Sequence, residues 1–143
     1  MSDWQQAITI VSVNVFVFRD GKLLLGKRKG GQAAGEWGTP SGRLEHMEGI
    51  EACARRELME ECGIEVGELH FSSVANVTAY PPRHVVLLTF VAEWKSGEVV
   101  NKEPEKCEEL GWFDVDHLPE PMTDGMRKSI EAYRTGKPFF DAP

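Results

Sequence analysis

Three glutamates, Glu57, Glu60 and Glu61, stand at the spacing i, i+3 and i+4 in one short stretch of the chain. On a helix that turns by about 100° per residue they fall within an arc of roughly 100°. Glu57 and Glu61 then repel each other, whereas a helix without a special role would more often pair Glu with Lys at this spacing. A hard cation such as Mg²⁺, which prefers oxygen ligands, would reverse that repulsion. The spacing predicts a divalent-metal site on a helix, and a solvated acidic face is the alternative for the trio alone.

The residues around the trio extend the pattern. Gly42 is followed by five residues and Glu48, then by seven residues and Arg56-Glu57-Leu58-x-Glu60-Glu61-x-Gly63-Ile64. This 23-residue stretch, 42–64, resembles the Nudix box at all nine of its defining positions, which is far more specific than a lone glycine-rich motif. The resemblance implies an α/β fold, an alpha/beta/alpha sandwich with a mixed β-sheet.

The resemblance also implies roles for residues of the box. Glu57, Glu60 and Glu61, with the backbone carbonyl of Ser41, are expected to bind Mg²⁺, or Mn²⁺ in its place. The remaining box residues with expected roles are Arg56, which would orient the glutamates, Glu48, which would support them, and Gly42, which would contact substrate. From the residues alone, Arg56 also fits a helix ion pair with Glu60, and Glu48 fits a hydrogen bond to the helix N-terminus.

Two positions depart from the common box pattern. Ser41 replaces a glycine in the usual Pro-Gly-Gly before the box, and Met47 stands where a glycine commonly precedes the first glutamate. If the backbone at either position needs a positive φ, the side chain strains it.

Further candidates lie outside the box. The family often places its general base in a separate loop, and the acidic segment 103–109 supplies Glu105 and Glu108 as candidates. Lys27 and Arg28 fit contacts to phosphate, and a solvated strand end is their alternative. Trp37 is the favoured residue for stacking on a base, whereas Trp112 fits the core.

The stretches 25–30 and 103–108 resemble MutT-like nucleoside-triphosphate diphosphatases. That resemblance implies an enzyme that hydrolyses a phosphoanhydride bond of an ordinary or oxidised nucleoside triphosphate and releases the monophosphate and pyrophosphate. Three alternatives remain: a diphosphatase acting on ADP-ribose or nucleotide sugars, a dihydroneopterin triphosphate hydrolase, and a non-catalytic Nudix ligand sensor. The box does not choose among them.

The elements that must position these residues follow from patterning and breakers. Apolar residues at both odd and even positions cover both faces of a strand, so they predict a central strand over 8–18. Asp20-Gly21 predicts a hairpin turn to a strand over 22–28. A glycine-rich loop over 29–35 and a short segment over 36–39 follow, and Pro40 starts another loop. We expect a helix over 49–62 that Gly63 ends. Strands over 71–80, 84–94 and 109–113, a helix over 124–134 and a tail over 137–143 complete the chain.

The length, charge and cysteine content of the chain limit its possible functions. The 143 residues suit one domain over 1–143, and a net charge of −7 argues against broad binding to nucleic acid. Three cysteines without a CxxC pair fit a reducing compartment, and the first residues lack the features of a secretory signal. We therefore expect a cytoplasmic protein with a small-molecule nucleotide substrate and no membrane partner. A homodimer through the first hairpin or the last helix fits the family.

Overall fold

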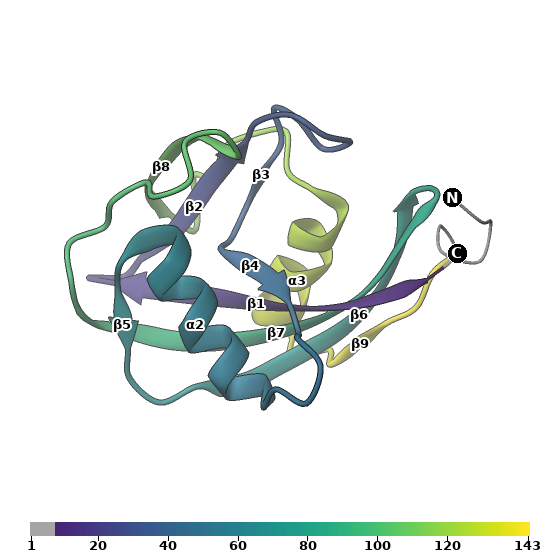
Figure 1. The fold of residues 1–143 in the computed structure, drawn as a ribbon, viewed down its shortest axis with the longest axis horizontal. Helices are drawn as coiled ribbons and strands as arrows, with labels where there is room; N and C mark the ends of the chain where they lie inside the picture. Colours follow the sequence, from purple (N-terminus) through teal and green to yellow (C-terminus); the bar gives the residue numbers. More distant parts are fainter. Residues whose placement is uncertain (1–7) are drawn as a thin grey trace.

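The strand β1 (Thr9–Arg19) runs through the middle of a mixed sheet because both of its faces are apolar. Val13, Val15 and Val17 pack on the face covered by helix α2 (Ile50–Cys62), and Phe16 and Phe18 pack in the cluster that includes residues of helix α3 (Asp124–Thr135). The two helices thus lie on opposite faces of the sheet (Figure 1). The predicted alpha/beta/alpha sandwich is confirmed. The structure, a computed structural model, describes residues 8–143.

The strands besides β1 are β2 (Lys22–Arg28), β3 (Trp37–Gly38), β4 (Ser41–Arg43), β5 (Glu65–Val66), β6 (His70–Tyr80), β7 (Arg83–Ser96), β8 (Cys107–Asp114) and β9 (Phe139–Phe140). They follow the order β3-β2-β1-β7-β6-β9, with β4 on β1, β5 on β7 and β8 on β2. Strand β7 runs parallel to β1, and β9 runs parallel to β6, whereas the other pairs are antiparallel.

The hairpin of β1 and β2 pairs only near its turn. Asp20 and Gly21 form the turn at φ 51° and 78°, and the registered pairs are Phe18 with Leu23 and Arg19 with Lys22. Along its whole length β2 also pairs with β8, and β3 pairs with β2 at Gly26 and Lys27. Strand β1 instead pairs with β4 over Ser12 to Asn14. The two strands therefore diverge away from the turn, as Figure 1 shows.

Helix α2 presents the carboxylates because its other face is apolar. Cys53, Ala54, Leu58 and Cys62 are buried against the sheet. Gly63 ends the helix at φ 71°, and its N–H donates to the carbonyls of Leu58 and Met59.

Most predicted elements are confirmed within a few residues, including the helix that ends at Gly63 and the helix expected over 124–134. Three expectations were wrong or incomplete. The segment after Pro40 is a strand, β4, rather than a loop, and β5 and β9 were not predicted. These strands have only two or three residues and depend on pairing with distant strands, which local patterning does not reveal.

Within residues 8–143, no helix is long and apolar enough to cross a membrane.

Substitution of Leu58 tests the packing that holds α2 against the sheet. Leu58 is 1% exposed, whereas its neighbour Met59 is 41% exposed. Leu58→Ala is expected to lower the free energy of unfolding by about 2–5 kcal/mol, because it leaves a cavity between α2 and the sheet. Met59→Ala, the matched control, should cost less than about 1 kcal/mol. Equal losses in denaturant titrations would contradict this packing.

Candidate active site

A cleft of about 790 Å³ opens where β1 and β2 diverge, and α2 forms one of its walls. It gathers residues from β1, β2, β4, α2 and the segment before β8. The predicted site residues that line it are Lys27, Arg28, Ser41, Gly42, Arg56, Glu57, Glu60 and Glu61.

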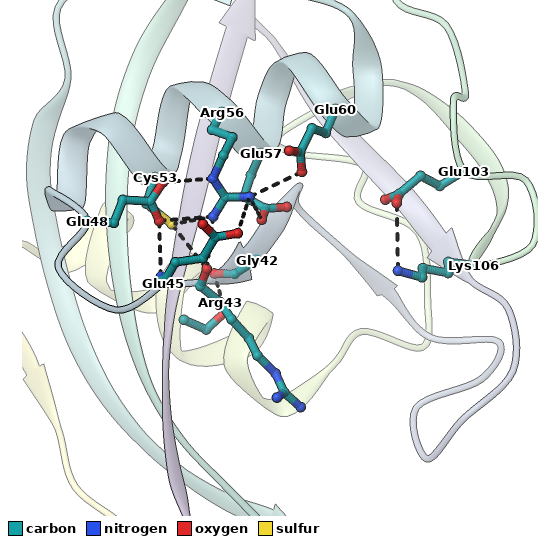
Figure 2. Close-up of polar contacts among 11 residues, drawn as sticks. Gly42, Arg43, Glu45, Glu48, Cys53, Arg56, Glu57, Glu60, Glu103 and Lys106 are labelled. Carbon is teal, nitrogen blue, oxygen red and sulfur yellow. Dashed lines mark hydrogen bonds and ion pairs between the residues drawn. The ribbon is translucent and has the colours of Figure 1, made fainter.

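Arg56 is the centre of an ion-pair network beside the cleft (Figure 2). Its Nε and Nη2 donate to the two carboxylate oxygens of Glu48 at 2.7 and 3.0 Å. Its Nη1 donates to Glu57 at 2.7 Å and to Glu60 at 3.2 Å. The bidentate contact with Arg56, and then the backbone N–H of Glu45, lower the pKa of Glu48 to about 2. Arg56 therefore makes both the contacts of an orienting residue and the ion pair with Glu60.

Glu57 lies directly against Gly42. A Cβ atom at position 42 would lie 1.9 Å from the carboxyl carbon of Glu57, so only glycine leaves this carboxylate in place. Burial raises the pKa of Glu57, and the hydrogen bond from Arg56 opposes that shift. Gly42 thus acts by its lack of a side chain.

Glu61 is the most deeply placed carboxylate of the trio. Its Oε2 is buried and has no hydrogen-bond partner within the described part of the chain. Burial raises its pKa to about 8, and the charges of Glu57 and Glu103 add to the shift, whereas the Ser41 backbone and Arg28 oppose it. An unpartnered buried oxygen costs free energy that a ligand can recover.

Glu103 reaches this cluster because the chain before it closes the end of α2. The N–H groups of Val100 and Lys102 donate to the carbonyls of Cys62 and Glu61 at 3.0 and 3.1 Å. These bonds satisfy helix-end carbonyls and bring the next residue, Glu103, to the wall of the cleft. Figure 2 shows Glu103 beside Lys106, on a loop separate from the Arg56 network.

The candidate general bases need a correction. Glu105 and Glu108 are exposed and do not line the cleft, and Glu108 instead lies 3.8 Å from Lys27 Nζ. Glu103, from the same acidic segment, lines the cleft instead, because the hydrogen bonds of 100–102 with the helix end turn this residue inward.

Trp37 also needs a correction. Its side chain is 7% exposed, packs edge-on to Phe113 at 5.0 Å between ring centres, and does not line the cleft. Trp37 therefore belongs to the core rather than to a base-stacking surface. Trp112 packs against the core, as expected.

The two departures from the box pattern have different outcomes. Ser41 lies in β4 in register with Asn14 and has no positive φ, so its backbone is unstrained. Met47 does adopt a positive φ of 64° and is 90% exposed. A side chain in this region costs roughly 1–2 kcal/mol relative to glycine, in a loop outside the cleft.

Positive charge gathers in the same cleft as the carboxylates. Arg28, Arg43 and Arg83 all line the cleft. Burial lowers the pKa of Arg83, and the charges of Arg28 and Arg43 lower it further. Like charges that converge in this way favour an anionic ligand, so Arg43 and Arg83 join the predicted Lys27 and Arg28 as candidates for contact with phosphate. Arg43 ends the short strand β4, which the sequence did not predict, whereas Arg83 begins β7, one residue before the strand expected over 84–94.

The carboxylates fit a metal ion by chemistry but are not preassembled around one. Among residues 8–143, no three His, Cys, Asp or Glu side chains are placed to hold an ion as they stand. Glu57 and Glu60 are held by Arg56, whereas Glu61 Oε2 has no hydrogen-bond partner in the part of the chain that the structure describes. The trio also lies toward the C-terminus of α2, whose last turn has no basic residue, so the helix dipole adds to the repulsion. A divalent cation, which prefers oxygen ligands, suits this concentration of carboxylates.

Comparison with known proteins identifies the family. The NUDIX domain model matches residues 9–133. The chain belongs to the Nudix hydrolase family. Members of this family generally need a divalent metal ion.

Three relatives of this Nudix protein are informative. A MutT NUDIX hydrolase from Burkholderia pseudomallei has 36% identity and a TM-score of 0.83, over 87% of this chain and 98% of that one. An NAD-capped RNA hydrolase NudC from Stutzerimonas stutzeri strain A1501 is 36% identical over 89% of this chain and 46% of its own length. An oxidized purine nucleoside triphosphate hydrolase from Danio rerio is 33% identical over 73% of this chain and 66% of its own. The chain thus spans under half the length of the NudC relative.

The raised pKa of Glu61 predicts how the stability of the metal-free protein depends on pH. In the folded protein Glu61 stays protonated up to about pH 8, whereas in the unfolded chain it ionises near 4.5. Between these values the unfolded state binds fewer protons, so the free energy of unfolding falls as the pH rises. Glu61→Gln removes this penalty and should be more stable than the wild type at pH 8, by on the order of a few kcal/mol, and nearly equal to it at pH 4.5.

Chemical denaturation in EDTA at several pH values measures this difference. Glu51→Gln, on the same helix but outside the cleft, is the control and should follow the wild type throughout. A Glu61→Gln advantage that is the same at pH 4.5 and pH 8 would show that the carboxyl group does not titrate as described.

Proposed function

We propose that this Nudix protein hydrolyses a phosphoanhydride bond in a nucleoside triphosphate, ordinary or oxidised, and releases the monophosphate and pyrophosphate with the help of Mg²⁺, or of Mn²⁺ in its place. One observation carries the proposal: the three box carboxylates and a group of basic side chains line the same cleft. A polyphosphate bound with divalent cations needs both kinds of group. The MutT relative and the oxidized purine nucleoside triphosphate hydrolase support the choice of substrate.

Glu57, Glu60 and Glu61, with the Ser41 carbonyl, would hold the metal. When bound, the cation neutralises phosphate charge and lowers the pKa of an attacking water. Arg56 positions Glu57 and Glu60 from one side, and the bidentate contact with Glu48 fixes Arg56 itself. Removal of Glu48 would therefore weaken the site indirectly.

The remaining steps fall to groups from other elements. Arg28 and Arg83 would bind the phosphates and the leaving pyrophosphate, with Arg28 suited to bidentate contact. Glu103 would take the proton of the attacking water, since it lines the cleft and its charge already acts on Glu57 and Glu61.

A second candidate substrate follows from the relatives named NAD-capped RNA hydrolases. NAD also contains a phosphoanhydride bond, so the same carboxylates could serve a dinucleotide or an RNA that carries it. The expectation that nucleic acid is no partner therefore stays a prediction. ADP-ribose, nucleotide sugars and dihydroneopterin triphosphate are tested as further substrates. The cytoplasmic location and the homodimer also stay predictions.

The first test incubates the protein with Mg²⁺ and ordinary and oxidised nucleoside triphosphates, NAD, NAD-capped RNA, ADP-ribose, nucleotide sugars and dihydroneopterin triphosphate. Chromatography should show monophosphate and pyrophosphate from a triphosphate. Glu61→Gln should reduce the rate by about 100-fold or more, because it removes the buried anionic ligand. Glu51→Gln should retain full activity. Cleavage of NAD or NAD-capped RNA alone would move the protein to the second candidate, and no cleavage of any substrate would reject both.

Glu103 and Glu105 form a matched pair for the proton acceptor. Glu103→Gln is expected to lower kcat by about 100-fold with a smaller change in KM, because general-base catalysis contributes roughly that much. Glu105→Gln, two residues away and exposed, should change neither constant appreciably. If the two variants have equal kinetics, Glu103 is not the base.

A further inference from the structure

A row of polar side chains crosses the buried middle of the sheet beside the cleft. Asn14 on β1 is in register with Thr89 on β7, and Thr89 is in register with Ser73 on β6. These side chains are 3%, 1% and 1% exposed, and Ser129 of α3, fully buried, covers the row. Burial of such groups is costly unless each finds a partner, so the row needs a reason in the middle of an otherwise apolar sheet.

The hydrogen bonds fix the orientation of the Asn14 side chain. Its Nδ2 donates to Thr89 Oγ1 at 3.2 Å and to Ser129 Oγ at 3.5 Å, and the Thr89 and Ser129 hydroxyls lie 2.9 Å apart. The Thr39 hydroxyl donates to Asn14 Oδ1. Both N–H donors of the amide are then used, whereas Asn14 Oδ1 and Thr39 Oγ1 each keep a lone pair.

Those two acceptors belong to the cleft. Asn14 and Thr39 line it, whereas Thr89, Ser73 and Ser129 do not. The apolar side chains of Leu87 and Met126 line the same cleft. Asn14 is also the cross-strand partner of Ser41, next to the carboxylate end. Apolar walls with a few placed polar groups are typical of a site for a flat organic ligand.

We infer that Asn14, together with Thr39, is a specificity-determining residue that presents two neighbouring acceptors to N–H donors on the edge of a nucleobase. The inference rests on the proposed function, which places the phosphates at the carboxylate end of this cleft. Among the common bases, guanine alone has two adjacent N–H donors on its pairing edge, at N1 and at the 2-amino group. Adenine, cytosine and uracil set an acceptor beside the donor, and two facing acceptors repel each other. The ligand class is a nucleotide with a guanine-type edge.

The test compares kcat/KM for guanosine triphosphate and inosine triphosphate, which differ only by the 2-amino group. The wild type should prefer the guanosine compound by about 10-fold or more, because the inosine compound leaves an acceptor unpaired. Asn14→Leu should bring the ratio close to one. Asn76→Leu is the matched control, since Asn76 lies on β6 and bonds Asp141 outside the cleft, and it should keep the wild-type ratio.

The possible outcomes separate the inference about Asn14 from the proposed triphosphate hydrolysis. Equal turnover of both compounds by the wild type, or an unchanged ratio in Asn14→Leu, overturns the inference while the proposed function stands. Absence of any triphosphate hydrolysis overturns the proposed function and this inference with it. Thermal melting checks that each variant folds. If Asn14→Leu does not fold, Thr39→Val decides, because removal of this acceptor should also reduce the ratio.

Discussion

Negative charge concentrated near the C-terminal end of α2 is the constraint on which the rest of the site depends. Glu57, Glu60 and Glu61 repel one another, the helix dipole disfavours them there, and burial raises the pKa of Glu57 and Glu61. Arg56 offsets part of this charge through contacts with Glu57 and Glu60, and Glu48 holds Arg56 in place. The unpartnered oxygen of Glu61 shows where compensation is incomplete.

The packing of the fold holds these carboxylates together at the cleft. Apolar packing around Leu58 holds the helix against β1, and the lack of a side chain at Gly42 leaves space for the Glu57 carboxylate. The divergence of β1 and β2 opens the cleft, into which the basic groups face from the other elements. Carboxylates and cations then share one cavity without neutralising each other completely, which suits an anionic ligand that arrives with a metal ion.

The box and the long elements could be predicted from the sequence because their information is local. Helix α2, its stop at Gly63 and the hairpin at Asp20-Gly21 depend on nearby residues. Glu103 could not be distinguished from Glu105 in this way, because backbone bonds between 100–102 and the end of α2 select it. Trp37 was expected to stack on a base, whereas packing against Phe113 buries it in the core. The position of Asn14 in the cleft could not be predicted, because Asn14 lies in an apolar strand. Its position depends on the register of β1 with Thr89 and Ser41.

Binding of Mn²⁺ followed by electron paramagnetic resonance tests the central claim most directly, because the signal of the free hydrated ion disappears when the ion is bound. If the α2 carboxylates hold a metal ion, the wild-type protein without nucleotide should bind at least one Mn²⁺ per chain. Glu61→Gln should weaken this binding by roughly 10-fold or more, since it removes an anionic oxygen ligand, and Glu51→Gln should not. Equal binding by the wild type and Glu61→Gln would contradict the claim that the charge on α2 is there to hold a metal ion.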